Sequence, residues 1–204
     1  YLWDKFGSSH KVKFVTVPFE EMIGEILTKT DHSVRGVILK RMMMRVASVV
    51  AKRMGVKALV TGESIGQVSS QTLTNLSVID GVADAMILRP LIVSDKQDII
   101  DEARKIGTVH FAESMPEYCG VISDRPTVKA DVNFVEAEES KIDMSLIEKL
   151  ADLSKWMDIR DIPEDTKQII GGDVEAVEFA ASNEVVVDIR SQDEIDKKEL
   201  VTDK

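Results

Sequence analysis

Cysteine is almost absent from this chain, since Cys119 is the only one among 204 residues. A lone cysteine excludes an intrachain disulfide and a zinc site built from several cysteines, and it fits a protein of the reducing cytosol. No stretch reaches the roughly 18 uncharged apolar residues that a membrane span needs. Residues 1–4 also lack the basic leader and apolar run of a signal peptide. We therefore expect a cytoplasmic protein with no membrane partner.

Histidine is scarce as well, and only His10, His32 and His110 occur. Their positions show no metal-ligand spacing to one another or to Cys119. We expect all three to be structural or surface residues, and we expect no metal site built from protein ligands.

Positive charge is unevenly distributed along a chain whose formal net charge is -10. Residues 1–130 hold 17 Lys and Arg against 15 Asp and Glu, whereas residues 131–204 hold 9 against 21. The acidic surplus belongs to the last third, so only the first two thirds could offer phosphates a neutral-to-basic surface. This distribution removes an objection to nucleic-acid binding without arguing for it.

Strand-like and helix-like patterns alternate over the first 107 residues. Glycines at 55 and 107 stop two of the helical patterns, as glycine commonly does. The predicted strands cover 12–17, 58–61 and 85–88. The predicted helices cover 20–28, the segment from a cap at Asp31 or Ser33 to Met54, and 95–106, and residues 64–80 are expected to be polar and then helical. Strands joined through helices favour right-handed crossovers in a parallel sheet. We therefore expect an α/β protein, with an open parallel sheet and helices on both faces.

The helix predicted up to Met54 has two sides. Its apolar residues follow the helical period, and the other side carries Arg41 and Arg45. Charged sides of surface helices are usually solvated. Asp31 or Ser33 is expected to cap the start of this helix, and Asp95 is expected to cap the helix that ends at residue 106.

The regular patterns break after residue 107, where Pro116, Gly120 and Pro126 indicate an extended loop. The rest of the chain is predicted to contain this loop over 111–129, helices over 131–140 and 145–156, a polar linker over 158–174 and a strand over 185–190. A lone edge strand buries too little surface to offset its chain entropy. We therefore expect residues 185–204 to lack well-defined packing.

Three motifs follow one another in a fixed order. Residues 36–43 read Gly-Val-Ile-Leu-Lys-Arg-Met-Met, residues 61–72 read Thr-Gly-Glu-Ser-Ile-Gly-Gln-Val-Ser-Ser-Gln-Thr, and residues 115–123 read Met-Pro-Glu-Tyr-Cys-Gly-Val-Ile-Ser. Each motif alone would be a weak signal. Together they resemble the bacterial tRNA 4-thiouridine synthetases, which also serve in making the thiamine thiazole. The likeness covers essentially the whole chain.

The resemblance implies a fold similar to the adenine-nucleotide α-hydrolase fold, with a pyrophosphate-binding (PP) loop at the first strand. The familiar Ser-Gly-Gly-x-Asp-Ser loop is absent, and Gly171-Gly172-Asp173 lies in the acidic linker with no strand before it. We therefore expect this fold without its first strand and phosphate loop. The implied division is the C-terminal part of an ATP-binding PP-loop domain over 1–130, an acidic helical extension and linker over 131–174, and the truncated start of a rhodanese-like domain over 175–204.

The reaction that the resemblance implies has two steps. ATP with magnesium adenylates the C4 oxygen of a tRNA uridine, and a persulfide sulfur then displaces AMP to give 4-thiouridine. Magnesium and positive side chains would offset the phosphate charge as it shifts to the leaving group. The implied partners are tRNA and a cysteine desulfurase as persulfide donor, and a homodimer is a further candidate assembly. We expect this chain to be part of that enzyme and inactive alone.

Two residues carry the expected catalysis. Cys119 lies in a loop without apolar period, which favours an exposed, reactive thiol over the small buried hydrophobe that a single cysteine most often is. By resemblance, it forms a transient disulfide with a rhodanese cysteine. Lys96 lies in the first turn of a capped helix, where the dipole does not favour a cation. A phosphate between Lys96 and the helix N-terminus would explain this position, and an ordinary surface lysine is the alternative.

Three residues are candidates for contact with the nucleotide. Gly62 ends a predicted strand, at the edge where open α/β sheets bind ligands, and it is otherwise a simple turn glycine. Gln71 is a polar residue on a packed segment that could bind adenine or phosphate, or it belongs to a solvated helix face. Lys40 is a nucleotide contact by resemblance and otherwise part of a charged helix face. Arg89, at a strand end, is a further candidate of the same kind as Lys96.

Two other functions stay open. The first is another nucleotide-activating ligase of the same fold, which would have no reason to carry a reactive Cys119 or a rhodanese-like tail. The second is a non-catalytic binding or dimerisation module, which would self-associate through apolar helix faces and bind neither ATP nor tRNA.

Overall fold

The computed structural model describes residues 1–114, 122 and 125–162. Cys119, the predicted strand at 185–190 and the expected rhodanese-like start at 175–204 lie outside these residues. What the sequence indicates for them therefore stays a prediction.

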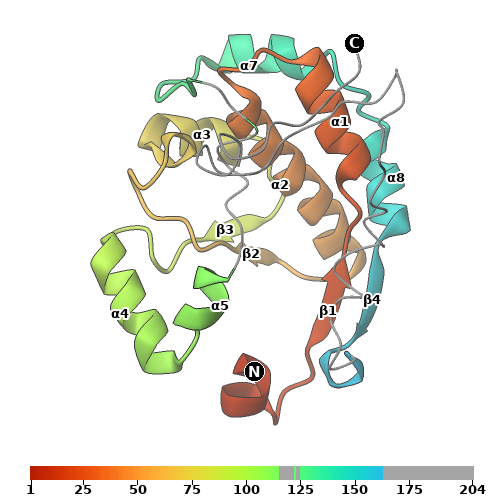
Figure 1. The fold of residues 1–204 in the computed structure, drawn as a ribbon. Coiled ribbons are helices and arrows are strands. Elements are labelled where there is room, and N and C mark those ends of the chain that lie inside the picture. The colour runs from red at the N-terminus through yellow and green to blue at the C-terminus, as the bar shows by residue number, and fades with distance from the viewer. Residues whose placement is uncertain (115–121, 123–124, 163–204) are drawn as a thin grey trace, which may run out of the picture.

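A long central helix organises the core. As Figure 1 shows, α2 (Arg35–Arg53) is surrounded by α1 (Glu20–Lys29), α3 (Leu73–Asp80), α7 (Val132–Glu139) and α8 (Leu146–Leu153). All five helices contribute buried apolar side chains to one cluster. Removal of these side chains from water is the main stabilising term of such a core. The described part of the 131–174 segment thus packs into the same core as the residues before it.

The parallel pair of strands is the part of the sheet that was predicted. β2 (Ala58–Val60) and β3 (Met86–Leu88) run parallel, with Leu59 opposite Ile87, and α3 lies in the connection between them. The side chains of Leu59 and Ile87 pack against the core. This arrangement confirms the α/β class with a parallel sheet.

Two further helices follow β3. In Figure 1, α4 (Lys96–Ile106) and α5 (Val109–Glu113) lie below the strand pair, whereas α2 and α3 lie above it. Asp95 caps α4 by accepting a hydrogen bond from the backbone N–H of Asp98 at 2.9 Å. Gly107 ends α4 with a φ of 78°, a left-handed conformation that glycine adopts easily. Both predictions about the ends of this helix are confirmed.

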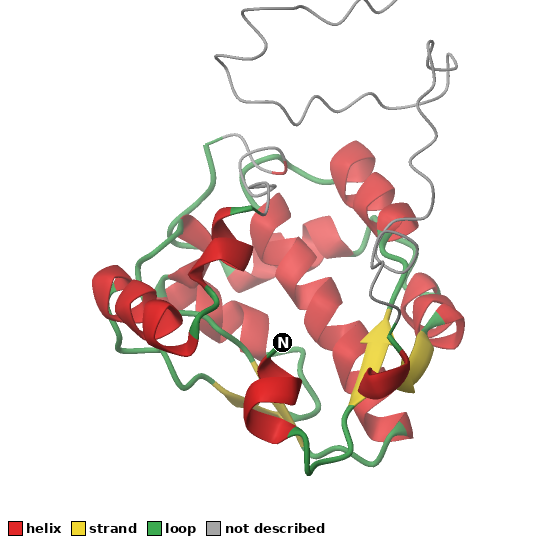
Figure 2. Ribbon diagram, turned by 60° about the horizontal axis from the view of Figure 1, so that its bottom comes forward, coloured by secondary structure: helices red, strands yellow, loops and turns green. Residues whose placement is uncertain are grey.

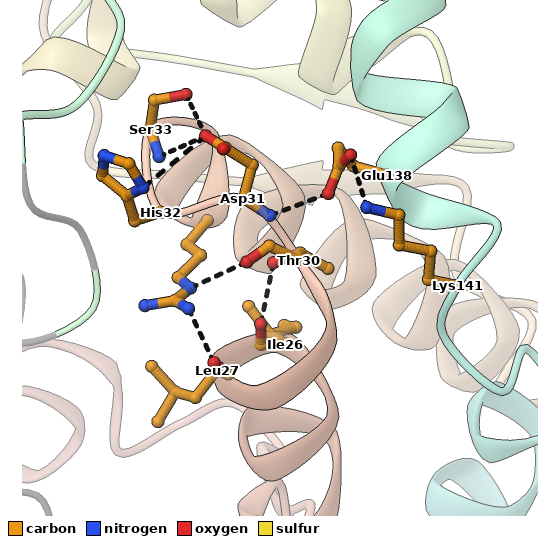
Figure 3. Close-up of polar contacts among 9 residues, drawn as sticks. Ile26, Leu27, Thr30, Asp31, His32, Ser33, Glu138 and Lys141 are labelled. Atoms are coloured by element: carbon orange, nitrogen blue, oxygen red, sulfur yellow. Dashed lines mark hydrogen bonds and ion pairs between the residues drawn. The ribbon is translucent and has the colours of Figure 1, made fainter.

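The start of α2 differs from its prediction. Val34 is the N-cap residue, and no side chain caps the helix there. As Figure 3 shows, Asp31 accepts a hydrogen bond from the backbone N–H of Ser33 at 2.9 Å, within the turn. The backbone N–H of Asp31 donates to Glu138 of α7 at 2.7 Å. The predicted cap is wrong because a contact with a distant helix fixes this turn instead.

The first strand has a different partner from the one expected. β1 (Lys13–Thr16) pairs antiparallel with β4 (Lys155–Asp158) and not with β2, so Figure 2 shows two separate strand pairs. The helix predicted over 145–156 ends at Leu153, and the chain then becomes extended at Ser154. That prediction was wrong because neither glycine nor proline marks the end of α8.

An apolar groove separates the two strand pairs. It has a volume of about 700 Å³, and its lining includes Val15 of β1, Leu59 of β2, and Leu39, Met43 and Val50 of α2. Every residue that lines it is apolar.

The basic side of α2 is not solvated throughout. Arg41 is only 1% exposed, and its Nε and Nη2 donate to the two carboxylate oxygens of Glu139 at 3.0 and 2.8 Å. Its Nη1 donates to the carbonyl oxygen of Val78 at 2.6 Å. Arg41 departs from the expectation of a solvated face because α7 packs over it and supplies the compensating charge.

Candidate functional site

The loops that follow β2 and β3 meet at one edge. The hydroxyl of Ser64 donates to the carbonyl oxygen of Ser94 at 2.6 Å, and the backbone N–H of Ile65 donates to the carbonyl oxygen of Ile92 at 3.0 Å. Parallel strands end at the same edge of a sheet, which is where open α/β folds bind ligands. We name this edge the carboxyl rim, and it consists of residues 61–66 and 89–96.

Gly62 lies in the carboxyl rim and is exposed. Its φ is outside the left-handed region, and a Cβ built on it would meet nothing within 4 Å. Neither backbone strain nor packing among the described residues therefore requires a glycine here. The open space beside its backbone would allow a ligand to approach closely.

Lys40 reaches the rim from α2. Its Nζ lies 2.6 Å from Oε1 of Glu63, the residue after Gly62, and the Lys40 side chain is 24% exposed. Lys40 thus lies partly buried beside the rim and not on an ordinary solvated face.

Arg89 joins the same group from the end of β3. Its Nε donates to Oε2 of Glu63 at 2.8 Å, and its Nη1 and Nη2 donate to the carboxylate of Asp80 at 2.8 and 2.5 Å. Burial alone would raise the pKa of Glu63, but the hydrogen bonds from Lys40 and Arg89 outweigh burial and lower it below its usual value. Glu63 is therefore held as a carboxylate between two cations.

Gln71 lies on the 3-10 turn Ser69–Gln71 that follows the rim. Its carbonyl oxygen accepts a hydrogen bond from the backbone N–H of Gly66 at 3.0 Å, which ties this turn to the rim. Its side-chain Oε1 is buried and has no hydrogen-bond partner within the described part of the chain. A buried acceptor without a donor is costly, so a donor from outside the described residues would stabilise this atom.

Lys96 is the first residue of α4 and the last residue of the rim, and it is exposed. Among residues 1–114, 122 and 125–162, no ion-pair partner is found for it. A free cation at a helix N-terminus can hold an anion jointly with the backbone N–H groups there.

In the described ranges, no group of three or more His, Cys, Asp or Glu could hold a metal ion. No helix within those ranges is long and apolar enough to cross a membrane.

Comparison with known proteins decides the family. The model of the family described as Thiamine biosynthesis protein (ThiI) matches residues 1–144. The chain belongs to the ThiI family. Membership agrees with the resemblance to tRNA 4-thiouridine synthetases that the three motifs indicated, and it confirms that prediction.

The ThiI relatives include named enzymes. The tRNA sulfurtransferase of Tolumonas auensis is 62% identical over 198 residues, which are 97% of this chain and 41% of that protein. The tRNA sulfurtransferase of Aeromonas salmonicida is 55% identical over 203 residues, which are 100% of this chain and 42% of that protein. This chain thus spans about two fifths of the length of the curated relatives it matches.

One solved structure is similar in fold as well. The crystal structure of a 4-thiouridine synthetase–RNA complex with bound ATP matches with a TM-score of 0.70 and 28% identity, over 77% of this chain and 42% of that chain. The likeness supports the α/β fold class that the PP-loop resemblance implied.

One residue that sequence reasoning missed ties the 3-10 turn after the rim to residues 127–130 of this ThiI family member. Asn75 is fully buried, and its side-chain Nδ2 donates to the carbonyl oxygens of Ser69 and Thr127 at 2.7 and 2.9 Å. Its Oδ1 accepts from the backbone N–H of Ala130 at 2.8 Å. The chain that returns after Cys119 is therefore fixed to the start of α3. An amide among the apolar residues Leu73, Leu76, Val78 and Ile79, shortly after the 61–72 motif, was the available signal.

Proposed function

We propose that this chain supplies the nucleotide-binding part of an ATP-dependent tRNA sulfurtransferase. The enzyme adenylates a tRNA uridine at C4 and replaces the oxygen with persulfide sulfur to give 4-thiouridine. The observation that carries the proposal is the convergence of Lys40, Gly62, Gln71 and Lys96 on the carboxyl rim. ThiI family membership and the likeness to a 4-thiouridine synthetase with bound ATP and RNA support it.

ATP fits the donors and acceptors of the rim. The exocyclic amino group of adenine is a donor that the unpartnered Oε1 of Gln71 can accept, whereas a phosphate offers only acceptors. We therefore assign Gln71 to the base. Lys96, at the N-terminus of α4, is assigned to a phosphate, and the open backbone at Gly62 gives room for the nucleotide.

Magnesium would act through the phosphates. Mg²⁺ usually keeps several waters and binds substrate phosphates with one or two carboxylates. The described residues offer no cluster of carboxylates for it, so no protein ligand is assigned to the ion. Bound to ATP, magnesium would neutralise phosphate charge.

Cys119 is assigned to the sulfur-transfer step. The terminal sulfur of a persulfide attacks C4, AMP leaves, and the thiolate of Cys119 then attacks the inner sulfur. A disulfide forms between Cys119 and the carrier cysteine, and the electron pair of the broken S–S bond goes to the sulfur that stays on C4. A thiol reductant restores both cysteines. The carrier cysteine would belong to a rhodanese-like domain that begins within 175–204.

The remaining partners follow from this reaction. A cysteine desulfurase loads the persulfide, tRNA receives the sulfur, and the thiamine thiazole is a second destination. We propose that the protein acts in the cytoplasm. A homodimer stays a prediction that light scattering of the purified protein would test.

The test needs a protein of full length. We suggest a chimaera in which this chain replaces the matching 41% of the Tolumonas auensis tRNA sulfurtransferase. With ATP, tRNA, a persulfide donor and a thiol reductant, the chimaera is expected to form 4-thiouridine over many turnovers. The parent enzyme, which should be active under the same conditions, is the control. The proposal is overturned if the chimaera folds and binds tRNA but neither binds ATP nor forms 4-thiouridine.

Variants of the chimaera test the assigned roles. Cys119→Ser is expected to abolish multiple turnovers while ATP binding stays unchanged, because only the disulfide step is lost.

Lys96→Ala is expected to lower turnover by about tenfold to a hundredfold, since a charge-stabilising contact is removed. The matched control is Lys105→Ala, because Lys105 lies at the other end of α4 and pairs with Glu102. Equal activity of the Lys96 and Lys105 variants would contradict the role of Lys96.

A further inference from the structure

The carboxylate of Glu63 is a junction of three elements. It accepts hydrogen bonds from Lys40 of α2 at 2.6 Å, from Arg89 after β3 at 2.8 Å, and from the hydroxyl of Thr61 after β2 at 3.1 Å. Glu63 itself is only 7% exposed, so all three contacts are made beneath the surface of the rim. Charge-assisted hydrogen bonds of this length are among the stronger ones in proteins.

The geometry of this junction differs from that of a purely internal ion pair. The Glu63 side chain points inward, while the neighbouring Gly62 is exposed. The Lys40 side chain remains 24% exposed, so part of it is open to solvent beside the rim while its ammonium is held by Glu63. Catalytic and binding groups gain most when such supports fix them before the ligand arrives.

We propose that Glu63 is a positioning residue that fixes the ammonium of Lys40 and the backbone at Gly62 for the nucleotide. The inference rests on the proposed function, because it assigns the rim to ATP. Glu63 does not touch ATP itself: an anion beside the phosphates would repel them, and its carboxylate is already occupied by Lys40 and Arg89. Arg89, clamped in turn by Asp80, keeps that carboxylate from following Lys40 outward.

The chain contains a matched control for this proposal. Glu138 is also 7% exposed, and its carboxylate accepts hydrogen bonds from Lys141 at 2.6 Å and from the backbone N–H of Asp31 at 2.7 Å. Figure 3 shows that these contacts join α7 to the turn before α2, and none of them involves a rim residue. Glu138→Gln therefore removes a carboxylate of the same exposed fraction, with its own lysine partner, without touching the rim.

The experiment measures steady-state kinetics of the full-length chimaera. Glu63→Gln is expected to raise the KM for ATP by about tenfold, with a change of less than about threefold in kcat and in the KM for tRNA, because ground-state positioning of ATP is lost. Glu138→Gln is expected to leave the KM for ATP within about twofold. Glu63→Asp keeps the charge but cannot reach both cations, so an intermediate rise of about threefold is expected, and this variant serves if Glu63→Gln does not fold.

A double-mutant cycle shows whether Glu63 acts through Lys40. If it does, the fold rise in the KM for ATP of Lys40→Met/Glu63→Gln is at least about fivefold smaller than the product of the fold rises of the two single variants. The inference about Glu63 is overturned if the chimaera is active and Glu63→Gln and Glu63→Asp change the KM for ATP no more than Glu138→Gln does. The proposed function would stand in that case. A folded, unsubstituted chimaera that does not use ATP overturns the proposed function itself.

Discussion

Among single residues, Arg41 and Glu139 show how α2 accommodates charge inside the core. Arg41 is 1% exposed and Glu139 is 4% exposed, and they form a bidentate ion pair. Arg45 donates to the same carboxylate at 3.1 Å. Loss of one partner from a buried pair leaves an uncompensated charge, which costs much more than the net contribution of the intact pair.

Glu139→Gln is therefore expected to lower the free energy of unfolding of the full-length chimaera by about 3 kcal/mol or more. Glu136→Gln is the control, because Glu136 also approaches Arg41, at 3.8 Å, but its side chain is 58% exposed. The control is expected to cost less than about 1 kcal/mol. Urea unfolding of both variants checks the difference, and equal losses would show that the buried pair is not what stabilises the contact between α2 and α7.

The pH dependence of the same pair has a definite sign. Burial acts to raise the pKa of Glu139, but the hydrogen bonds from Arg41 and Arg45 outweigh it, so the pKa is lowered on folding. A lowered pKa means that the unfolded chain takes up the proton first as the pH falls. The stabilisation is present above the unfolded pKa of about 4.3 and is lost as the pH falls through the folded value. As the pH falls below 5, the free energy of unfolding should therefore decrease less for Glu139→Gln than for the unsubstituted protein. Urea unfolding at several pH values measures this difference.

At the scale of helices and strands, the sequence predicted those features that depend on residues close together in the chain. The ends of α4 follow from Asp95 and Gly107, whose side-chain and backbone preferences act within one turn. The pairing of β1 with β4 could not be predicted, since Lys13 lies opposite Asp158, far away in the sequence. The end of α8 could not be predicted either, because pairing with β1 extends the chain there and no helix-breaking residue does.

The candidate site was predictable to a similar degree. Gly62 and Lys96 could be placed because a strand end and a helix start are visible in the sequence, and parallel strands end at one edge. The burial of Glu63 could not be predicted, since it depends on Lys40 and Arg89 arriving from two other elements. Asn75 was missed for the same reason, because its partners Thr127 and Ala130 lie more than 50 residues away.

Asn75 joins the start of α3 to residues 127–130, so its removal should destabilise both segments. Asn75→Ala is expected to lower the free energy of unfolding of the chimaera by about 2 to 3 kcal/mol, because buried backbone groups at Thr127 and Ala130 lose their partner. Cleavage by a protease within residues 125–130 should also become faster. The control is Asn133→Ala on the exposed side of α7, which should change neither quantity. Unchanged cleavage in the Asn75 variant would contradict its role as an anchor.

At the scale of the whole molecule, the described residues form an apolar groove between the two strand pairs. Its volume is about 700 Å³, and every lining residue is apolar. Apolar grooves of this size in soluble proteins usually mark an interaction site. β1 and β2 lie on its two sides and belong to different strand pairs. The curated relatives carry more than half of their length outside the matched segment. We therefore expect polypeptide from that additional length to cover the groove in the full-length protein.

A dye that fluoresces on apolar surfaces tests this coverage. The isolated 204-residue chain should bind it at least about fivefold more strongly than the full-length chimaera does. Met43→Glu places a charge in the groove, so it should lower dye binding by the isolated chain and destabilise the chimaera by about 3 kcal/mol, because the charge becomes buried there. Leu153→Glu, at a residue of similar exposure outside the groove (50% against 48% for Met43), should do neither. If the chimaera tolerates Met43→Glu and binds the dye as strongly as the isolated chain, the groove is open in the full-length protein, and the expected coverage is wrong.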